Sequence, residues 1–74
     1  MTRIATIFVA LLGEGSDVWR PVKASSLGDG RFVVNGPLPD DEQWEFEPGS
    51  RVLCETRVFQ DGTEGLVATK RLGA

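Results

Sequence analysis

The chain has 74 residues, with 8 Lys or Arg, 11 Asp or Glu, and a formal net charge of -3. A chain of this length forms one domain with a thin hydrophobic core. Its single cysteine excludes an internal disulfide, and its lack of histidine leaves no plausible zinc site. Stability must therefore come from apolar packing or from a partner chain. The acidic balance disfavours a surface that follows nucleic-acid phosphates.

Alternation of apolar and polar residues predicts five β-strands, at residues 4–12, 18–27, 31–35, 52–60 and 65–71. The first is apolar on both faces, so it should be central or covered by the rest of the chain. In the second, Pro21 cannot donate to a ladder, which predicts a sheet edge or a bulge at that point. The residues predicted to face inward from the second, fourth and fifth strands are Val18, Val22, Ala24, Val52, Cys54, Thr56, Val58, Leu66 and Ala68.

The turns between these strands have strong local signals. Gly28-Asp29-Gly30 and Asp61-Gly62-Thr63 are typical of tight hairpins, and Pro48-Gly49 suits a type II turn. Five short strands joined in this way predict an all-β fold, a small and mainly antiparallel SH3-like barrel with one long connection between the third and fourth strands. An OB-type barrel is the alternative. It needs a helix in that connection, where Asp40 begins one turn at most.

The long connection holds the densest run of acids, with no Lys or Arg from residue 36 to residue 49. A solvated negative loop is the ordinary interpretation, and the spacing of a calcium loop is absent, so no metal is expected. Packing of Trp44 and Phe46 onto the barrel is favoured. If instead both tryptophans and Phe59 were exposed, they would line a peptide groove, and nearby acids would favour a basic partner segment. The acids of the loop are Asp40, Asp41, Glu42, Glu45 and Glu47.

A second unusual surface begins at Asp17. Trp19 alternates with the inward valines, so it either covers the end of the barrel or contacts a ligand, and the first is favoured. For Arg20, an ion pair with Asp17 or with the acidic loop is favoured over a clamp for a carboxylate or phosphate. We expect this surface and the acidic loop to lie close together, with Arg20 facing acids. Cys54 is expected to be a buried, inert thiol.

Three blocks of sequence carry a resemblance: Gly15-Ser16-Asp17-Val18-Trp19-Arg20-Pro21-Val22, Leu27-Gly28-Asp29-Gly30, and Asp40-Asp41-Glu42-Gln43-Trp44-Glu45-Phe46 before Pro48-Gly49-Ser50. With them the chain resembles a group of short, stand-alone bacterial proteins of uncharacterised function. The resemblance implies a bacterial, cytoplasmic origin and implies no activity.

These observations predict a non-enzymatic binding module in the cytoplasm, without cofactor, metal, membrane or small-molecule substrate. Its partner would be another protein or a second copy of the chain. The alternative is a nucleic-acid-associated barrel, which the net charge disfavours and which requires the basic side chains to gather on one face away from the acidic loop. The candidate partner-binding residues are Asp17, Trp19, Arg20, Trp44, Glu45 and Phe46.

Overall fold

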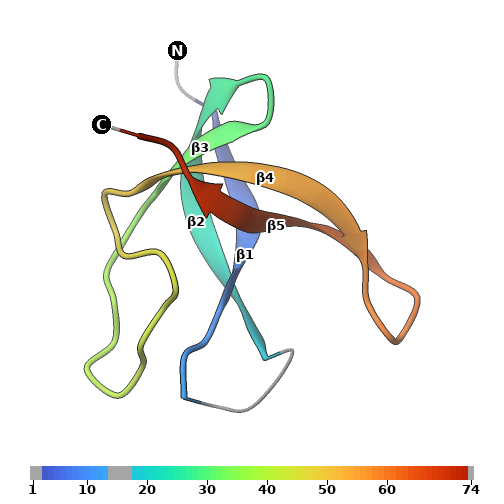
Figure 1. Cartoon of the computed structure of the whole chain (residues 1–74), viewed down its shortest axis with the longest axis horizontal. Helices are drawn as coiled ribbons and strands as arrows, with labels where there is room; N and C mark the ends of the chain where they lie inside the picture. The colour runs from blue at the N-terminus through green and yellow to red at the C-terminus, as the bar shows by residue number, and fades with distance from the viewer. Residues whose placement is uncertain (1–2, 14–17, 74) are drawn as a thin grey trace.

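A computed structural model describes residues 3–13 and 18–73. It contains the strands β1 (Ile4–Ala10), β2 (Trp19–Gly28), β3 (Arg31–Val34), β4 (Arg51–Val58) and β5 (Glu64–Arg71). They close into a barrel in chain order, with antiparallel neighbours except for the parallel pair β1 and β5 (Figure 1). The predicted small SH3-like barrel with a long connection between β3 and β4 is confirmed. The OB-type alternative is wrong, because that connection contains no helix.

The predicted turns are present and explain the tight connections. Asp29 and Gly30 both have positive φ, 56° and 79°, as a two-residue hairpin turn of type I′ requires. The Ser50 N–H donates to the Glu47 carbonyl at 3.0 Å, and Gly49 between them has φ 92°, which identifies the predicted type II turn. The residue types in these two turns thus determine where the chain reverses direction.

The core lies inside the barrel and takes alternate residues from each strand, because successive side chains of a strand point to opposite faces. The long connection adds Trp44 and Phe46, which are 7% and 6% exposed. The interpretation that they pack onto the barrel is confirmed. The buried core consists of Ile7, Val9, Leu11, Val22, Ala24, Phe32, Val34, Trp44, Phe46, Val52, Cys54 and Ala68.

The second apolar face of β1 is covered only in the middle. Ile4 and Leu12 are 59% and 49% exposed, whereas Phe8 between them is half-buried. Phe8 lies opposite Val67 of β5 and within reach of the loop that joins β4 to β5. β1 is therefore central, as expected, between β2 and β5, and the chain covers its second face at Phe8 but not at Ile4 or Leu12.

The prediction for the end of β4 is wrong. Thr56 and Val58 were expected to face inward, but both are exposed, and Val58 is 60% exposed. β3 pairs with β4 only at Arg51–Leu53, and the register of β4 against β5 shifts between Leu53 and Cys54. The second half of β4 therefore pairs with β5 alone, and the two strands project from the barrel as a hairpin (Figure 1).

Pro21 lies at a sheet edge, as predicted. It is opposite Phe8 of β1, and β2 pairs with β3 only from Ala24 to Gly28. On its other side, no strand of the described chain pairs with β2 at Pro21, so the missing N–H costs no ladder hydrogen bond there.

Candidate functional site

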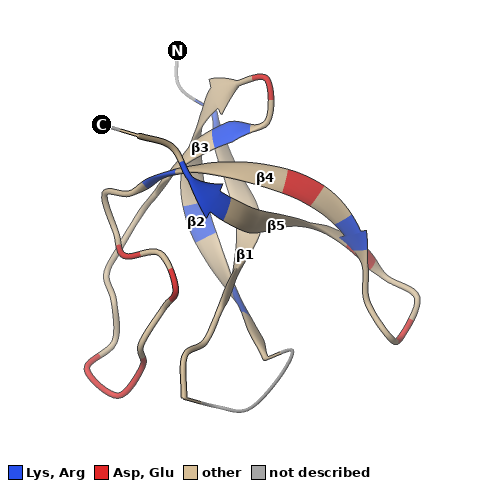
Figure 2. Ribbon diagram, viewed as in Figure 1, with Lys and Arg blue, Asp and Glu red and all other residues tan. Residues whose placement is uncertain are grey.

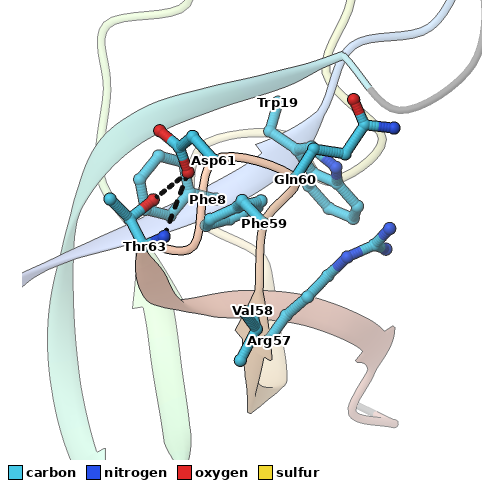
Figure 3. Close-up of a pocket in the computed structure, with 8 residues that line it drawn as sticks. All are labelled: Phe8, Trp19, Arg57, Val58, Phe59, Gln60, Asp61 and Thr63. Atoms are coloured by element: carbon cyan, nitrogen blue, oxygen red, sulfur yellow. Dashed lines mark hydrogen bonds between the residues drawn. The ribbon is translucent and has the colours of Figure 1, made fainter.

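The main candidate site is a cleft of about 640 Å³ on the outside of the barrel. It lies where the projecting β4–β5 hairpin turns back toward β1 and the start of β2 (Figure 3). Here we call it the aromatic cleft. Its lining residues are Phe8, Trp19, Arg57, Val58, Phe59, Gln60, Asp61 and Thr63.

Three aromatic rings form one wall of this cleft, and the Phe59 ring lies between the other two (Figure 3). Its centroid is 5.0 Å from that of Phe8 and 6.4 Å from that of Trp19, with interplanar angles of 63° and 61°. Such edge-to-face pairs are worth about 0.5–1.5 kcal/mol each beyond their burial. The Arg57 guanidinium carbon lies 5.2 Å from the Trp19 ring centroid, in cation–π range. The rings are therefore held in place while remaining partly exposed.

A glycine on β5 allows the rings to approach the sheet. A Cβ atom at Gly65 would lie 2.7 Å from the Phe8 ring and 3.0 Å from the Phe59 ring, closer than packed carbon atoms tolerate. Sequence reasoning treated Gly65 only as the start of a strand and missed Phe8 as a surface residue. The apolar second face of β1 was the one available signal for Phe8.

The rim of the cleft is organised by Asp61. Its Oδ1 atom accepts hydrogen bonds from the Thr63 hydroxyl at 2.7 Å and from the Thr63 N–H at 3.0 Å (Figure 3). These bonds favour the charged carboxylate and hold the pKa of Asp61 below its usual value. The rim therefore presents a negative charge at neutral pH on a turn whose shape is fixed.

The two tryptophans differ in how their indole N–H groups are satisfied. Trp44 donates to Glu42 at 2.9 Å. The Trp19 N–H is covered but finds no acceptor among the described residues. A buried donor without a partner is rare in folded proteins, because it loses its hydrogen bond to water without replacement.

Arg20 faces the acidic loop, as predicted. Its guanidinium pairs with both carboxylate oxygens of Glu42, and the Glu42 side chain is only 15% exposed. The hydrogen bond from Trp44 and the pairing with Arg20 lower the pKa of Glu42. Backbone bonds fix the same segment to the end of β1, since Leu12 donates to Gln43 at 2.7 Å. The Arg20–Glu42–Trp44 set therefore anchors the loop.

Of the six predicted site residues, only Trp19 lines the aromatic cleft. Trp44 and Phe46 are buried in the core, which leaves no groove for them to line. Glu45 is exposed on the loop, away from the cleft lining, and Asp17 lies outside the described residues. Trp19 and Arg20 are adjacent in the chain but contact different surfaces. The Trp19 side chain packs against Phe59 in the aromatic cleft, and the Arg20 side chain pairs with Glu42 of the acidic loop.

A second, smaller cleft of about 300 Å³ lies beside the acidic loop, and Asp40, Asp41 and Glu42 contribute to its lining. Within the described ranges no three of the His, Cys, Asp and Glu residues are placed so that they could hold a metal ion. Cys54 is buried, as predicted, and burial raises the pKa of its thiol to about 11. Such a thiol is a poor nucleophile at neutral pH.

No protein-family model, no curated protein and no solved structure matches this chain. The resemblance to short bacterial proteins thus stays a prediction, as does a cytoplasmic location. None of the described residues belongs to a helix that is long and apolar enough to cross a membrane.

Proposed function

We propose that this chain is a non-enzymatic binding module that takes a short, extended segment of another protein into the aromatic cleft. The observation that carries the proposal is the wall of Phe8, Phe59 and Trp19. These rings stand outside the barrel core and line a cleft of about 640 Å³. Binding sites typically combine aromatic walls with a few placed polar groups.

The chemistry of the cleft favours a segment with an apolar side chain next to a basic one. The rings offer an apolar surface and Asp61 on the rim offers a negative charge, while Arg57 of the same lining is already placed over the Trp19 ring. A backbone carbonyl of the segment would supply the acceptor that Trp19 lacks, once the group that covers its N–H moves aside. Tryptophans in such positions often dominate binding energy.

The hydrogen bonding of the polar side chains Asp61 and Thr63 favours binding over catalysis. Asp61 and Thr63 bond to each other within the turn, a common way for aspartate to stabilise a loop. A carboxylate with a lowered pKa is a weak base and is not protonated at neutral pH, so Asp61 is suited to pairing with a cation.

The test is selection of a random peptide display library on the wild-type chain and, in parallel, on the Trp19→Ala and Phe59→Ala variants. Peptides enriched on the wild type should bind Trp19→Ala about 30-fold more weakly, because truncating a dominant residue costs about 2 kcal/mol. Leu27→Ala is the matched control, since Leu27 is 46% exposed and lies outside the cleft lining.

Nuclear magnetic resonance provides an internal control for the same peptides. The indole N–H signal of Trp19 should shift on binding, whereas that of Trp44 should stay, because it is already bonded to Glu42. Failure to enrich any peptide, or equal binding by folded Trp19→Ala and Phe59→Ala variants, would show that the cleft is not the binding site.

A further inference from the structure

We propose that the partner segment binds as an added β-strand along residues 55–58 of β4, here called the open edge, with a basic side chain opposite Glu55. The inference rests on the proposed function and adds the conformation and the charge of the segment that is recognised. In the projecting hairpin, the open edge has β5 on one side and no strand of the described chain on the other (Figure 1).

The direction of the backbone groups of β4 decides what this edge offers. The Cys54 N–H donates to the Gly30 carbonyl at 2.8 Å, which is the last backbone bond on the side of β3. Backbone groups of successive residues in a strand point to opposite sides, so residues at two-residue steps share a side. Thr56 and Val58 therefore direct their N–H and C=O groups toward the open side, where no described strand pairs with them.

The alternate residues of β4 are occupied with β5. The Phe59 N–H donates to the Thr63 carbonyl at 2.8 Å. Glu55 and Arg57, at two-residue steps before Phe59, therefore also direct their backbone groups to β5. The irregularity in this pairing places its extra residue, Thr69, in β5, so β4 itself alternates regularly. The open edge thus offers donors and acceptors in the geometry that a strand requires.

Proteins usually protect such edges from pairing with other chains, often with proline or lysine. The stretch of β2 that β3 leaves unpaired carries Pro21, which has no N–H group to offer to an added strand. Residues 54–60 contain neither proline nor lysine. The open edge of β4 is therefore able to accept a strand, whereas proline disfavours one at β2.

The open edge is continuous with the aromatic cleft. Arg57, Val58 and Phe59 all line the cleft, although successive side chains of a strand point to opposite faces. A surface that reaches all three has to follow an edge of the chain at this point. The edge toward β5 is paired, and no residue of β5 lines the cleft. A segment held by the aromatic rings can therefore continue along the open edge.

The side chains of the open edge specify the sequence of the segment. Glu55 is exposed and forms no ion pair within the described residues, whereas Arg57 lies over the Trp19 ring. Figure 2 shows acidic and basic positions on this part of β4. A basic residue opposite Glu55 would complete a cross-strand ion pair. On the other face Val58 is 60% exposed, so an apolar residue would cover it. In antiparallel pairing, an apolar residue opposite Thr56 directly precedes the basic one.

A second copy of the chain fits this edge less well. Antiparallel pairing that joins Thr56 of one copy to Val58 of the other places the two Arg57 side chains opposite each other, which destabilises a sheet. Pairing of Thr56 with Thr56 instead puts Val58 where Gly30 is already bonded to Cys54. The open edge therefore favours a separate segment over self-association.

The test uses the peptide most strongly enriched on the wild-type chain in the display selection, with an N-methyl group placed at one backbone nitrogen at a time. In an added strand, every second N–H bonds to β4 and the others face solvent. N-methylation should therefore weaken binding at least about tenfold at alternate positions and less than about threefold between them, because main-chain bonds supply the affinity of added strands. A peptide held only by its side chains would show no such period.

Amide hydrogen exchange provides a matched control within the chain. The N–H groups of Thr56 and Val58 should exchange rapidly in the free chain and at least about tenfold more slowly with saturating peptide, because they gain partners. Those of Glu55 and Arg57 are bonded to β5 in both states and should change less.

The charge of the segment is tested with Glu55→Gln. This variant should bind the peptide about two- to fivefold more weakly, the range expected for one cross-strand ion pair. Glu45→Gln is the matched control, because it removes the same charge from the exposed loop outside the cleft lining. Circular dichroism checks that both variants are folded.

The outcomes separate this inference from the proposed function. Binding that depends on Trp19 but shows no alternation on N-methylation, or leaves Thr56 and Val58 unprotected, would overturn the added strand and leave the aromatic cleft as the binding site. Alternation and protection with a peptide that binds Trp19→Ala as tightly as wild type would support the open edge and count against the cleft. Enrichment of no peptide would end both proposals.

Two further results bear on the choice of ligand. Equal binding of the peptide by wild type and folded Glu55→Gln would overturn the basic residue opposite Glu55. Protection of Thr56 and Val58 that grows with protein concentration, without peptide, would assign the edge to a second copy and overturn the inference.

Discussion

At the scale of single residues, the two tryptophans show how position in the fold decides the role of a side chain. Trp44 is enclosed in the core and its N–H has an acceptor, so its contribution is structural. Trp19 is half-buried, contacts Phe59 and Arg57, and has an N–H without an acceptor among the described residues. Both are the same residue type beside charged neighbours in the sequence, so the distinction depends on their surroundings in the fold.

Replacing Gly65 tests whether the Phe8 and Phe59 rings have to lie close to β5. Gly65→Ala should destabilise the fold by about 1–3 kcal/mol, because its methyl group would overlap the Phe8 and Phe59 rings. Urea denaturation measures the change. Gly73→Ala is the control, since no atom lies within 4 Å of its added Cβ, and it should change stability by less than about 0.5 kcal/mol. Equal stability of the two variants would contradict the packing described for the cleft.

At the scale of elements, the connection between β3 and β4 behaves as part of the barrel. Trp44 and Phe46 insert into the core, and a bridge pairs Leu11 with Trp44. Glu42 ties the segment to β2 through Arg20. A 16-residue connection (residues 35–50) without a helix needs such anchors, because its backbone has few partners of its own.

Lowering the pH should break the contacts by which Glu42 anchors this loop to Arg20 and Trp44. The pKa of Glu42 is lowered from 4.5 in the folded chain, so its contribution to stability is complete above pH 4.5 and is lost as the pH falls through the lower folded value. Glu42→Gln keeps an acceptor for Trp44 but does not titrate, so its melting temperature should fall less between about pH 7 and about pH 3 than that of the wild type. Asp40→Asn, a neutralised acid of the same loop, should keep the wild-type pH dependence. Identical profiles for Glu42→Gln and wild type would refute the anchor.

The projecting hairpin is the element that sequence reasoning described least well. Alternation placed Thr56 and Val58 inside, because period-2 patterns assume that the sheet continues beside the strand. β3 is only four residues long, so β4 outruns its neighbour and its inner face meets solvent. Strand lengths on either side, rather than the pattern within β4, decide where the core ends.

At the scale of the whole molecule, the reactivity of the Cys54 thiol measures opening of the barrel. Its thiol is buried, and the rise of its pKa from 9.0 to about 11 lowers the thiolate fraction about 100-fold, since each pKa unit is a factor of ten. A thiol reagent at about pH 8 should therefore react at least about 100-fold faster in urea than with the native chain.

The control is a Cys54→Ser chain with Val58→Cys, which places the only thiol on the exposed hairpin. That variant should react rapidly without denaturant. Fast labelling of native wild-type Cys54 would contradict the buried position of this side chain.

The distribution of charged side chains over the surface can also be judged only at this scale. A net charge of -3 led to the expectation that nucleic acid is disfavoured as a partner. The alternative function required the basic side chains to gather on one face away from the acidic loop, yet Arg20 pairs with Glu42 of that loop and Arg57 lies over Trp19 in the aromatic cleft. The expectation is still untested, and a mobility shift with DNA and RNA at low salt would test it.

Local sequence was enough to predict the number of strands, the turns at residues 28–30, 48–49 and 61–63, and most of the core. These features follow from local causes: alternation with period 2, glycine at positive φ and proline at an edge. The position of Arg20 near the acidic loop was also predicted correctly.

Which outward residues meet could be learned only from the folded barrel. Phe8 and Phe59 lie about fifty residues apart in the chain, and Trp19, which packs against Phe59, comes from a different strand than Phe8. Such contacts depend on register and on strand length across the sheet, and alternation within a single strand carries no information about either.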